Sequence, residues 1–308
     1  MDLKISVIMP TYKRSQFLSR AIDSVLGQTY SNIEVVVVDD NSEGTKYRAD
    51  TEKCMLKYAD NNKVLYIKNP VNLGGGKARN AGIKAATGYY VTFLDDDDIY
   101  LPKKVEVQLN HMIQFDLDLS FMDVLLHDSK NHLIDYRKHS YVKDTSNESL
   151  LKYHLMYHLT PTATYMFKRT ALLSIGGFAD IKLSQEYMLM LECIKSGMKI
   201  GYVPEAYVIQ YIHEGERLSV GKNKFEGEKV LYEIKKTYFH LLSRRQIKYI
   251  KFRYRAVLLF TGIRSRRLDV AFINLLAALF TSPLDAFSEL VRRKKLIKQV
   301  GKVNKDIV

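Results

Sequence analysis

The sequence YYVTFLDDDD at residues 89–98 places four consecutive aspartates directly after an apolar run typical of a buried strand. Neighbouring carboxylates repel one another, and an ionised carboxylate is costly to bury unless a cation or hydrogen-bond donors replace the lost water. Oxygen ligands suit Mg2+ and Mn2+, which bind through one or two carboxylates together with substrate phosphates. The alternative is a solvated turn whose last residue, Asp98, caps a helix beginning near Pro102. We favour a cation-binding site, because four aspartates after a buried strand exceed what a turn or a cap requires.

On either side of these aspartates, apolar segments alternate with segments of helical periodicity. The pattern predicts helices at residues 17–26, 49–58 and 77–86, between strands at residues 4–9, 33–38, 64–67 and 89–94. Such βαβ units predict an α/β fold with a mostly parallel, Rossmann-like sheet and helices on both faces. Ligands of these sheets bind at the carboxyl ends of the strands. Three polar clusters follow predicted strands there: Thr11-Tyr12, Asp39 to Ser42, and Asp95 to Asp98.

The composition is that of a folded protein of ordinary size. The chain has 308 residues, of which 46% are hydrophobic and 11% aromatic, enough for one large domain or one domain with an appendage. Only two cysteines occur, Cys54 and Cys193, which indicates neither a disulfide framework nor a zinc site. The first predicted strand begins near residue 4 and leaves no room for a signal peptide. We therefore expect a cytoplasmic protein.

The positive charge is concentrated near the C-terminus. The net charge is +13, but residues 242–308 hold 16 lysines and arginines against 4 acidic residues, and the first 241 residues are nearly neutral. Basic clusters flank an apolar run at residues 270–280, which is shorter than the roughly 20 apolar residues of a membrane-spanning helix. One helix face would carry Phe272, Leu275, Leu276, Leu279 and Phe280. We expect this basic helical extension to attach peripherally to an anionic membrane surface, and we expect no nucleic acid partner. The alternative is that its helices pack on the body of the protein or on a second subunit, which leaves a homo-oligomer open.

Several short motifs, taken in order, resemble those of one enzyme family. They are Ser6 to Arg14, Ala21 to Tyr30, Val37 to Ser42, Asn72 to Gly74, Ala78 to Ile83, Asp95 to Asp98, Gly176 to Phe178 and Gln185 to Tyr187. Each motif alone is weak, but their ordered combination is specific and resembles the family 2 inverting glycosyltransferases of the GT-A fold, of the type that builds bacterial cell-surface glycans. The resemblance covers roughly residues 4–225. It implies a catalytic domain at residues 1–225, with the basic extension at residues 226–308, and an enzyme that uses a sugar nucleotide and commonly a divalent metal, Mn2+ or Mg2+.

The resemblance implies a nucleotide-binding role for residues after the first strands. Pro10, Thr11 and Tyr12 would hold the nucleobase together with Asp40, which would accept from a ring N–H, while Asp39 would mainly support the turn. The alternative for the aspartate pair is a simple Asx turn at the strand end. Arg79 would lie near the base or the phosphates, or else be a solvated helix cation.

In the family's Asp-x-Asp motif, Asp95 and Asp97 match the two aspartate positions. The metal would lie on Asp97, and Asp95 or Asp96 would contact the ribose or the metal's water ligands. Some relatives also place a histidine against the metal or diphosphate where this chain has His213, which is otherwise a packed or solvated histidine. Arg217 is a further candidate for the diphosphate.

The resemblance also implies the catalytic base. Inverting transfer needs a carboxylate that deprotonates the acceptor hydroxyl, and Glu186 aligns with the aspartate of the family's Glu-Asp motif. The chain departs from that motif at both positions, with Gln185 for Glu and Glu186 for Asp. The alternative is a first-turn glutamate favoured by the helix dipole, and Glu192 is a weaker candidate for the base. His154 and His158 share a helix face, but no third metal ligand is evident beside them.

We therefore expect an inverting transferase that moves a sugar from a nucleoside diphosphate sugar, with UDP-sugars favoured, to a hydroxyl of a glycan or lipid-linked oligosaccharide. The stretch from Tyr153 to Thr164, which includes Thr160 to Thr162, corresponds to the region that shapes the acceptor side in the family. One alternative is a nucleotidyltransferase, although the segment after the first strand lacks the glycine-rich loop of that class. The other is a non-catalytic scaffold that binds polyanions or membranes, which would need the basic extension but not the aspartates.

Overall fold

The computed structural model describes residues 2–181, 184–212, 222–289 and 291. The chain forms two compact units. The first comprises residues up to 150 together with residues 159–212, and the second comprises residues 151–158 and the described residues from 222 onward. The boundary predicted at residue 225 lies within helix α8 (Lys222–Lys236), and it stays a prediction of where the catalytic part ends.

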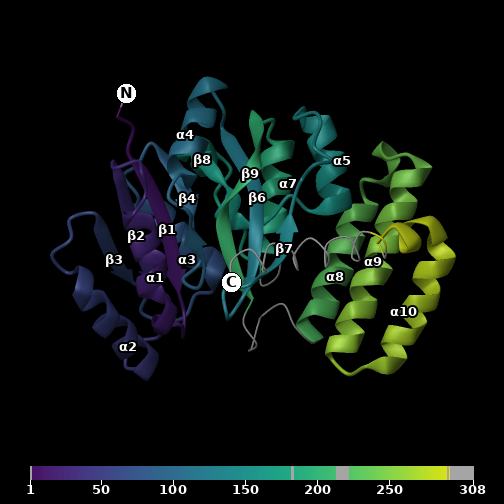
Figure 1. The fold of residues 1–308 in the computed structure, drawn as a ribbon, viewed down its shortest axis with the longest axis horizontal. Helices are drawn as coiled ribbons and strands as arrows, with labels where there is room; N and C mark the ends of the chain where they lie inside the picture. The colour runs from purple at the N-terminus through teal and green to yellow at the C-terminus, as the bar shows by residue number, and fades with distance from the viewer. Residues whose placement is uncertain (1, 182–183, 213–221, 290, 292–308) are drawn as a thin grey trace. The chain divides into compact units, whose positions relative to one another are not determined.

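The first unit contains a sheet whose first half is parallel, as the sequence predicts (Figure 1). Its strands are β1 (Ile5–Thr11), β2 (Ile33–Asp39), β3 (Val64–Lys68) and β4 (Tyr90–Phe93), in the order β3-β2-β1-β4. In the register, Thr11 lies opposite Asp39, and Ile8 lies opposite Phe93. Parallel strands end at the same edge of a sheet, so the polar residues that follow β1, β2 and β4 meet there.

The second half of the sheet is mixed. It continues through β8 (Met166–Lys168), β6 (Leu119–Asp128), β9 (Ile200–Ile212) and β5 (Ile99–Tyr100), and β7 (Leu133–Arg137) pairs with β6. β8 runs antiparallel to β4 and to β6, whereas β6 and β9 are parallel. The expectation of a mostly parallel sheet therefore holds for the half that carries the first predicted strands.

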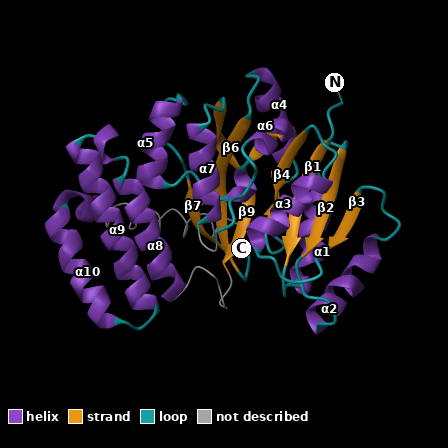
Figure 2. Cartoon of the chain, turned by 180° about the vertical axis from the view of Figure 1, so that it is seen from behind, coloured by secondary structure: helices purple, strands orange, loops and turns teal. Residues whose placement is uncertain are grey.

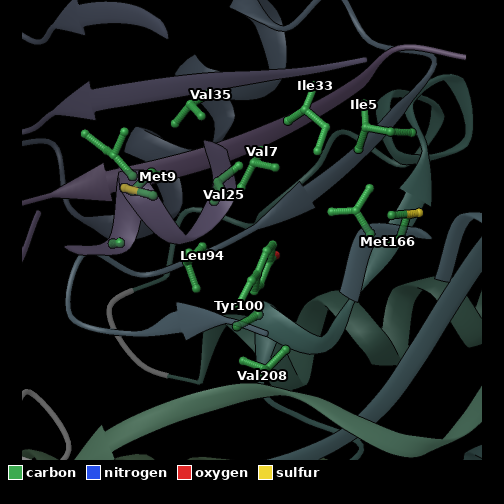
Figure 3. Packing of buried hydrophobic residues seen from close by; sticks show 14 of the residues in the cluster. Ile5, Val7, Met9, Val25, Ile33, Val35, Leu94, Tyr100, Met166 and Val208 are labelled. Atoms are coloured by element: carbon green, nitrogen blue, oxygen red, sulfur yellow. The ribbon is translucent and has the colours of Figure 1, made fainter. Parts of the chain in front are cut away.

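Helices cover both faces of the parallel half. Successive side chains of a strand point to opposite faces, so each strand can contact helices on both sides. Ile5, Val7 and Met9 of β1 pack in one core cluster with the apolar face of α1 (Ser15–Leu26) (Figure 3). The side chain of Ile8, between them, points to the other face and meets α3 (Gly75–Ala85) beside Gly82, where a Cβ would lie 2.4 Å from Ile8 Cγ2. The first unit also contains the helices α2 (Lys46–Met55), η1 (Leu56–Tyr58), α4 (Lys104–Gln114), η2 (Thr162–Thr164), α6 (Arg169–Ser174) and α7 (Gln185–Lys195). The predicted α/β class with helices on both faces is confirmed (Figure 2).

The second unit is helical. It contains the last part of α5 (Asn147–Tyr157), then α8, η3 (Phe239–Leu241), α9 (Arg244–Arg264) and α10 (Leu268–Thr281). α9 begins with a capping box, in which Ser243 and Gln246 satisfy each other's backbone N–H groups. A hydrophobic core cluster of the second unit is built from Leu155, Met156, Leu242 and Ile250. Among the described residues, each helix alone is too short or too polar to cross a membrane, although α10 and the segment Pro283–Glu289, bent by 112°, together reach the length and apolarity required.

Candidate active site

The ends of β1 and β4 are joined directly by polar side chains. Thr11 Oγ1, at the end of β1, donates to Asp96 Oδ2 at 2.7 Å, and the Tyr12 backbone N–H donates to the same oxygen at 3.4 Å. Asp96 is buried, and burial raises its pKa to about 7 although the Arg14 guanidinium acts in the opposite direction. Of the four aspartates, Asp96 therefore anchors the segment after β1 to the segment after β4.

Asp39, at the end of β2, is a structural anchor. Its buried carboxylate accepts from the backbone and side-chain N–H groups of Asn41 and from the hydroxyl of Tyr66. Arg48 of α2 lies 3.1 Å from its second oxygen. These bonds support the turn after β2, which is the role that the resemblance implies.

Asp40 points to a different set of partners. One oxygen accepts from Asn69 Nδ2 and Leu73 N, and the other accepts from Asn72 Nδ2 and Gly74 N. A carboxylate offers about four lone-pair sites, so Asp40 is fully used in holding the loop that leads into α3. The predicted contact with a nucleobase stays a prediction, and it requires one of these donors to be exchanged.

A cavity of about 420 Å³ opens beside this edge of the sheet. Its walls come from the segment after β1 and from the segment between β2 and α2: Tyr12, Lys13, Asn41, Ser42, Thr45, Lys46 and Tyr47. Lys13 Nζ lies 4.9 Å from the ring centroid of Tyr12 and 5.1 Å from that of Tyr47. Two aromatic rings and a cation next to polar side chains suit a planar, anionic ligand such as a nucleotide. Of the residues predicted for the nucleobase, Tyr12 lines this cavity, while Pro10 lies within β1.

Asp95 and Asp97 are each paired with an arginine. Arg79 of α3 donates to Asp95 Oδ1 at 2.5 Å, and Arg14 donates to Asp97 Oδ2. Arg20 of α1 also donates to the backbone carbonyl of Asp97 at 2.7 Å. The site therefore contains both the carboxylates that a metal needs and the cations that a diphosphate needs.

Arg79 is buried beside two acids. Burial lowers the pKa of its guanidinium, whereas Asp95 and Glu186 raise it, and the net direction is upward. Its Nε has no hydrogen-bond partner among the described residues. Because Arg79 is buried, it is not the solvated surface cation of the alternative. Its Nε–H remains as a donor beyond the pair with Asp95.

Arg14 and Arg20 were not among the predicted site residues. Arg14 follows β1 by three positions, and Arg20 lies one and a half turns further along the chain in α1. The available signal was a cation directly after a strand whose end also carries Thr11 and Tyr12. The pairing with Asp97 joins segments more than 75 residues apart, and such long-range contacts are not encoded in local spacing.

Asp98 does not cap the following helix, contrary to the expectation. Helix α4 begins at Lys104, and its N-cap residue Lys103 makes no side-chain cap. Asp98 instead accepts from the Tyr211 backbone N–H at 3.0 Å and from Gln210 Nε2 at 3.2 Å. Burial raises its pKa well above the ordinary value, and the nearby Asp97 and Asp95 add to the effect. The fourth aspartate thus binds the end of β9 to the site.

Glu186 lies in the first turn of α7, which begins against α3. A Cβ on Gly76 would lie 3.0 Å from the Gln185 amide, so glycine at this position lets the two helix starts approach. Glu186 is half-buried, and it acts electrostatically on both Arg79 and Tyr165. No hydrogen bond from a described residue reaches its carboxylate. The structure therefore brings Glu186 to the same site as the aspartates, beside Arg79.

The remaining candidate residues do not join this site in the described part of the chain. Glu192 was the weaker candidate for the catalytic base. Glu192 is exposed on α7 and pairs with Lys195 at 2.9 Å. His158, which shares a helix face with His154 in the sequence, accepts from Lys235 Nζ at 2.7 Å in the second unit. His213 and Arg217 lie outside the described residues.

The donor set fits a divalent metal. Among the described residues, no group of three or more His, Cys, Asp or Glu side chains is placed to hold a metal ion by itself. Asp95 and Asp97 nevertheless offer two partly exposed carboxylates at one edge of the sheet, with side chains 36% and 13% exposed. Mg2+ and Mn2+ need only one or two carboxylates when substrate phosphates and water complete the shell.

Two of the motifs, Ala78 to Ile83 and Gly176 to Phe178, are bonded to each other beside the site. Asn80 of α3 exchanges two hydrogen bonds with the backbone of Phe178, and the Phe178 ring lies 5.5 Å from the Arg79 guanidinium. Gly177 has a φ of +72°, and a Cβ there would lie 2.5 Å from Asn80 Oδ1. The segment before α7 is therefore fixed to the helix that carries Arg79.

The chain is similar to several known proteins. The family model described as glycosyl transferase family 2 matches residues 6–173. An uncharacterized glycosyltransferase of Methanocaldococcus jannaschii is 30% identical over 211 residues, which cover 67% of this chain and 70% of that protein. A UDP-Glc:alpha-D-GlcNAc-diphosphoundecaprenol beta-1,3-glucosyltransferase of Escherichia coli is 36% identical over 122 residues, or 39% of this chain and 45% of that protein. The crystal structure of S. aureus TarS 1-349 in complex with UDP-GlcNAc is similar with a TM-score of 0.61 at 19% identity, covering 90% of this chain and 91% of that one.

Proposed function

This chain belongs to glycosyl transferase family 2 and is a glycosyltransferase of the GT-A fold, and from that premise we propose that it moves a sugar from a UDP-sugar to a hydroxyl of a glycan or lipid-linked acceptor, with inversion at the transferred carbon. Membership of this family argues against both a nucleotidyltransferase and a non-catalytic scaffold. The observation that carries the proposal is the convergence of Asp95, Asp97 and Glu186 at one edge of the sheet, with Arg14 and Arg79 beside them.

The nucleoside of the donor occupies the cavity lined by Tyr12 and Tyr47. The ring of Tyr12 stacks on the base, and Lys13 lies close enough to both tyrosines to meet the ribose or a phosphate. UDP is favoured because the E. coli relative is named as a user of UDP-Glc and TarS has been solved with UDP-GlcNAc. The acceptor assignment has similar support, since the E. coli relative is named for a lipid-linked GlcNAc acceptor.

The diphosphate lies over the aspartates. Asp97 and Asp95 would hold a divalent metal, which, when bound, supplies Lewis-acid stabilisation of the leaving diphosphate. Arg79 keeps a buried donor without a partner among the described residues, and Arg14 is half-exposed, so both can turn to phosphate oxygens once the carboxylates bind a metal. Arginines and carboxylates that neutralise one another in the free enzyme would thus each gain a partner from the donor complex.

Glu186 acts as the general base. It removes the proton of the acceptor hydroxyl while the hydroxyl oxygen attacks the anomeric carbon from the face opposite the leaving UDP. Its carboxylate is half-buried, and among the described residues none donates a hydrogen bond to it, so its lone pairs are available to an acceptor. The Arg79 guanidinium lies close enough to interact electrostatically with this carboxylate.

The test compares two glutamates of the same helix. Glu186→Gln should lower transfer from the preferred UDP-sugar by about 10²–10⁴-fold, the usual effect of losing a general base, with little change in UDP affinity. Glu192→Gln is the matched control, because Glu192 is exposed and paired with Lys195, and it should retain normal turnover.

The measurement is UDP release and product formation with UDP-, GDP- and dTDP-sugars, together with calorimetric UDP binding. Near-normal turnover by Glu186→Gln would reject Glu186 as the base while leaving donor use intact. Binding and transfer with GDP- or dTDP-sugars in preference to UDP-sugars would reject the donor assignment.

A further inference from the structure

The exposed side of helix α10 is apolar, whereas the exposed side of a helix in a water-soluble protein is usually polar. It has eight exposed residues, of which seven are large and apolar: Leu268, Phe272, Ile273, Leu275, Leu276, Leu279 and Phe280. The eighth is Asp269. Phe280 is 86% exposed, and Phe272 and Ile273 are each 62% exposed. A helix that met only water on this side would carry polar residues there.

The polar residues of this region face α9 instead. Asn274 is buried and accepts from Arg255 at 3.2 Å, and Asp285 is buried and accepts from Arg245 at 2.5 Å. Ser282, also buried, donates to Asp285 at 2.6 Å. These polar groups are satisfied within the second unit, so the exposed apolar side chains are not explained by a lack of polar residues in the segment.

Small residues allow the close approach of the two helices. Ala271 and Ala278 are buried against α9, and a Cβ on Gly262 would lie 2.9 Å from the Ala271 backbone nitrogen. The two helices lie side by side (Figure 1) and pack through these small residues, whereas the large apolar residues of α10 are exposed. Contact through small residues with large apolar side chains outward is the arrangement found where the surroundings are themselves apolar.

The apolar surface continues past the end of α10. The chain bends by 112° into the segment Pro283–Glu289, where Leu284 and Phe287 are 74% and 69% exposed. α10 has 14 residues, a length of about 21 Å, which is shorter than the roughly 30 Å hydrocarbon core of a bilayer. This length and the bend suit an element that lies within one leaflet rather than one that crosses.

We propose that the surface formed by α10 and Pro283–Glu289 inserts into the interfacial region of an anionic lipid bilayer. Arg264, Arg266 and Arg267 are exposed at the turn directly before Leu268, where they can meet anionic headgroups. A symmetric contact with a second copy would place a second set of these positive charges at the same surface, whereas anionic headgroups neutralise them, so charge favours the bilayer over a dimer. This inference does not depend on the donor or on the catalytic base.

The experiment measures binding of the full-length chain to lipid vesicles by cosedimentation. One set of vesicles is pure phosphatidylcholine and the other contains phosphatidylglycerol. The double variant Phe272→Ser/Phe280→Ser should weaken partition by roughly tenfold or more, because both rings leave water on insertion. The matched control is Leu56→Ser/Val71→Ser, which removes two exposed apolar side chains from the first unit and should bind like the wild type.

A third variant separates charge from apolar insertion. Arg264→Gln/Arg266→Gln should weaken binding to the anionic vesicles by roughly tenfold and leave binding to the neutral vesicles unchanged. Added salt should have the same selective effect. All variants should keep the far-UV spectrum and melting temperature of the wild type, because the substituted side chains are exposed.

Three results would overturn the proposal. They are no binding of the wild type to either kind of vesicle, equal loss of binding in the phenylalanine variant and its control, and a marked fall in the melting temperature of the phenylalanine variant. Sedimentation velocity without lipid tests whether a second copy of the chain binds to this surface instead. A dimer that the phenylalanine variant dissociates, in a protein that does not bind vesicles, would assign this surface to a second copy instead.

Discussion

Glu34 should be one of the strongest single contributors to the stability of the first unit. It is buried at the start of β2, on the edge of the sheet opposite the candidate site, where it accepts from Lys4, from the Ser6 hydroxyl and from both N–H and hydroxyl of Thr87. Burial alone would raise its pKa, but these donors outweigh burial and lower the pKa from 4.5 to about 2. Since one pKa unit corresponds to about 1.4 kcal/mol, the ionised group contributes about 3 kcal/mol to the free energy of unfolding.

The sign of the pH dependence follows from the direction of this change. A carboxyl whose pKa is lower in the folded protein contributes its full stabilisation above pH 4.5 and loses it as the pH falls toward 2. Glu34→Gln should therefore lower the free energy of unfolding by about 3 kcal/mol at pH 7. The difference from the wild type should shrink as the pH is lowered through this range.

The assay is urea unfolding followed by far-UV circular dichroism at several pH values between 7 and 3. Glu52→Gln is the control, because Glu52 pairs with Lys68 at 3.0 Å with both side chains more than 40% exposed, and such a pair is worth about 1 kcal/mol or less. A difference between Glu34→Gln and the wild type that stays constant with pH would refute the electrostatic reasoning. So would a loss no larger than that of the control.

Three further outcomes are expected. Asp97→Asn should weaken the complex of nucleotide and Mn2+ by roughly 2–5 kcal/mol, as for truncating one partner of a buried charge pair in a complex. Equal UDP affinity of the wild type with Mn2+ and with chelator, measured by calorimetry, would contradict the metal assignment. Lys104→Met should raise the melting temperature at pH 7, because burial lowers the pKa of the Lys104 amine well below its ordinary value and the buried amine therefore destabilises the fold below that ordinary value. That gain should diminish as the pH rises toward 10, and its absence at every pH would mean that burial does not lower this pKa. Gly82→Ala should destabilise the first unit by about 1–3 kcal/mol, since the added Cβ lies 2.4 Å from Ile8 Cγ2, and an unchanged urea midpoint would show that α3 can move aside.

The half of the sheet that the sequence predicts is built from mostly apolar strands rich in β-branched and aromatic residues. β2 reads IEVVVVD, and no other regular element accommodates such a run as well. β6 reads LSFMDVLLHD, with polar residues in its interior, and β8 has only three residues, so neither was predicted. Asp123 within β6 accepts from the Tyr202 hydroxyl and from the His139 backbone N–H. When the hydrogen-bond partners of a polar residue come from distant segments, the local sequence pattern predicts a loop in place of a strand.

The same limit applies to the site. Asp39 and Asp40 are adjacent in sequence, and no local pattern tells which of them faces Arg48 and which faces the loop before α3. Asp98 was expected to act locally, as a helix cap, whereas its donors come from β9, more than 110 residues later. The candidate carboxylates could thus be named from the sequence, but the arginine that each one meets could not.

Within α2, the residues that line the cavity beside β2 differ from those that anchor the helix, and this separation bears on how the proposed donor preference can change. Arg48, Thr51 and Met55 hold α2 in place from its buried side, whereas Lys46 and Tyr47 in its first turn are exposed and contribute to the cavity wall. Substitutions at the exposed positions alter the ligand surface at little expense in folding free energy. If the cavity binds the donor nucleoside as proposed, exchange of Lys46 and Tyr47 should change nucleotide preference while leaving the buried side of α2 unchanged.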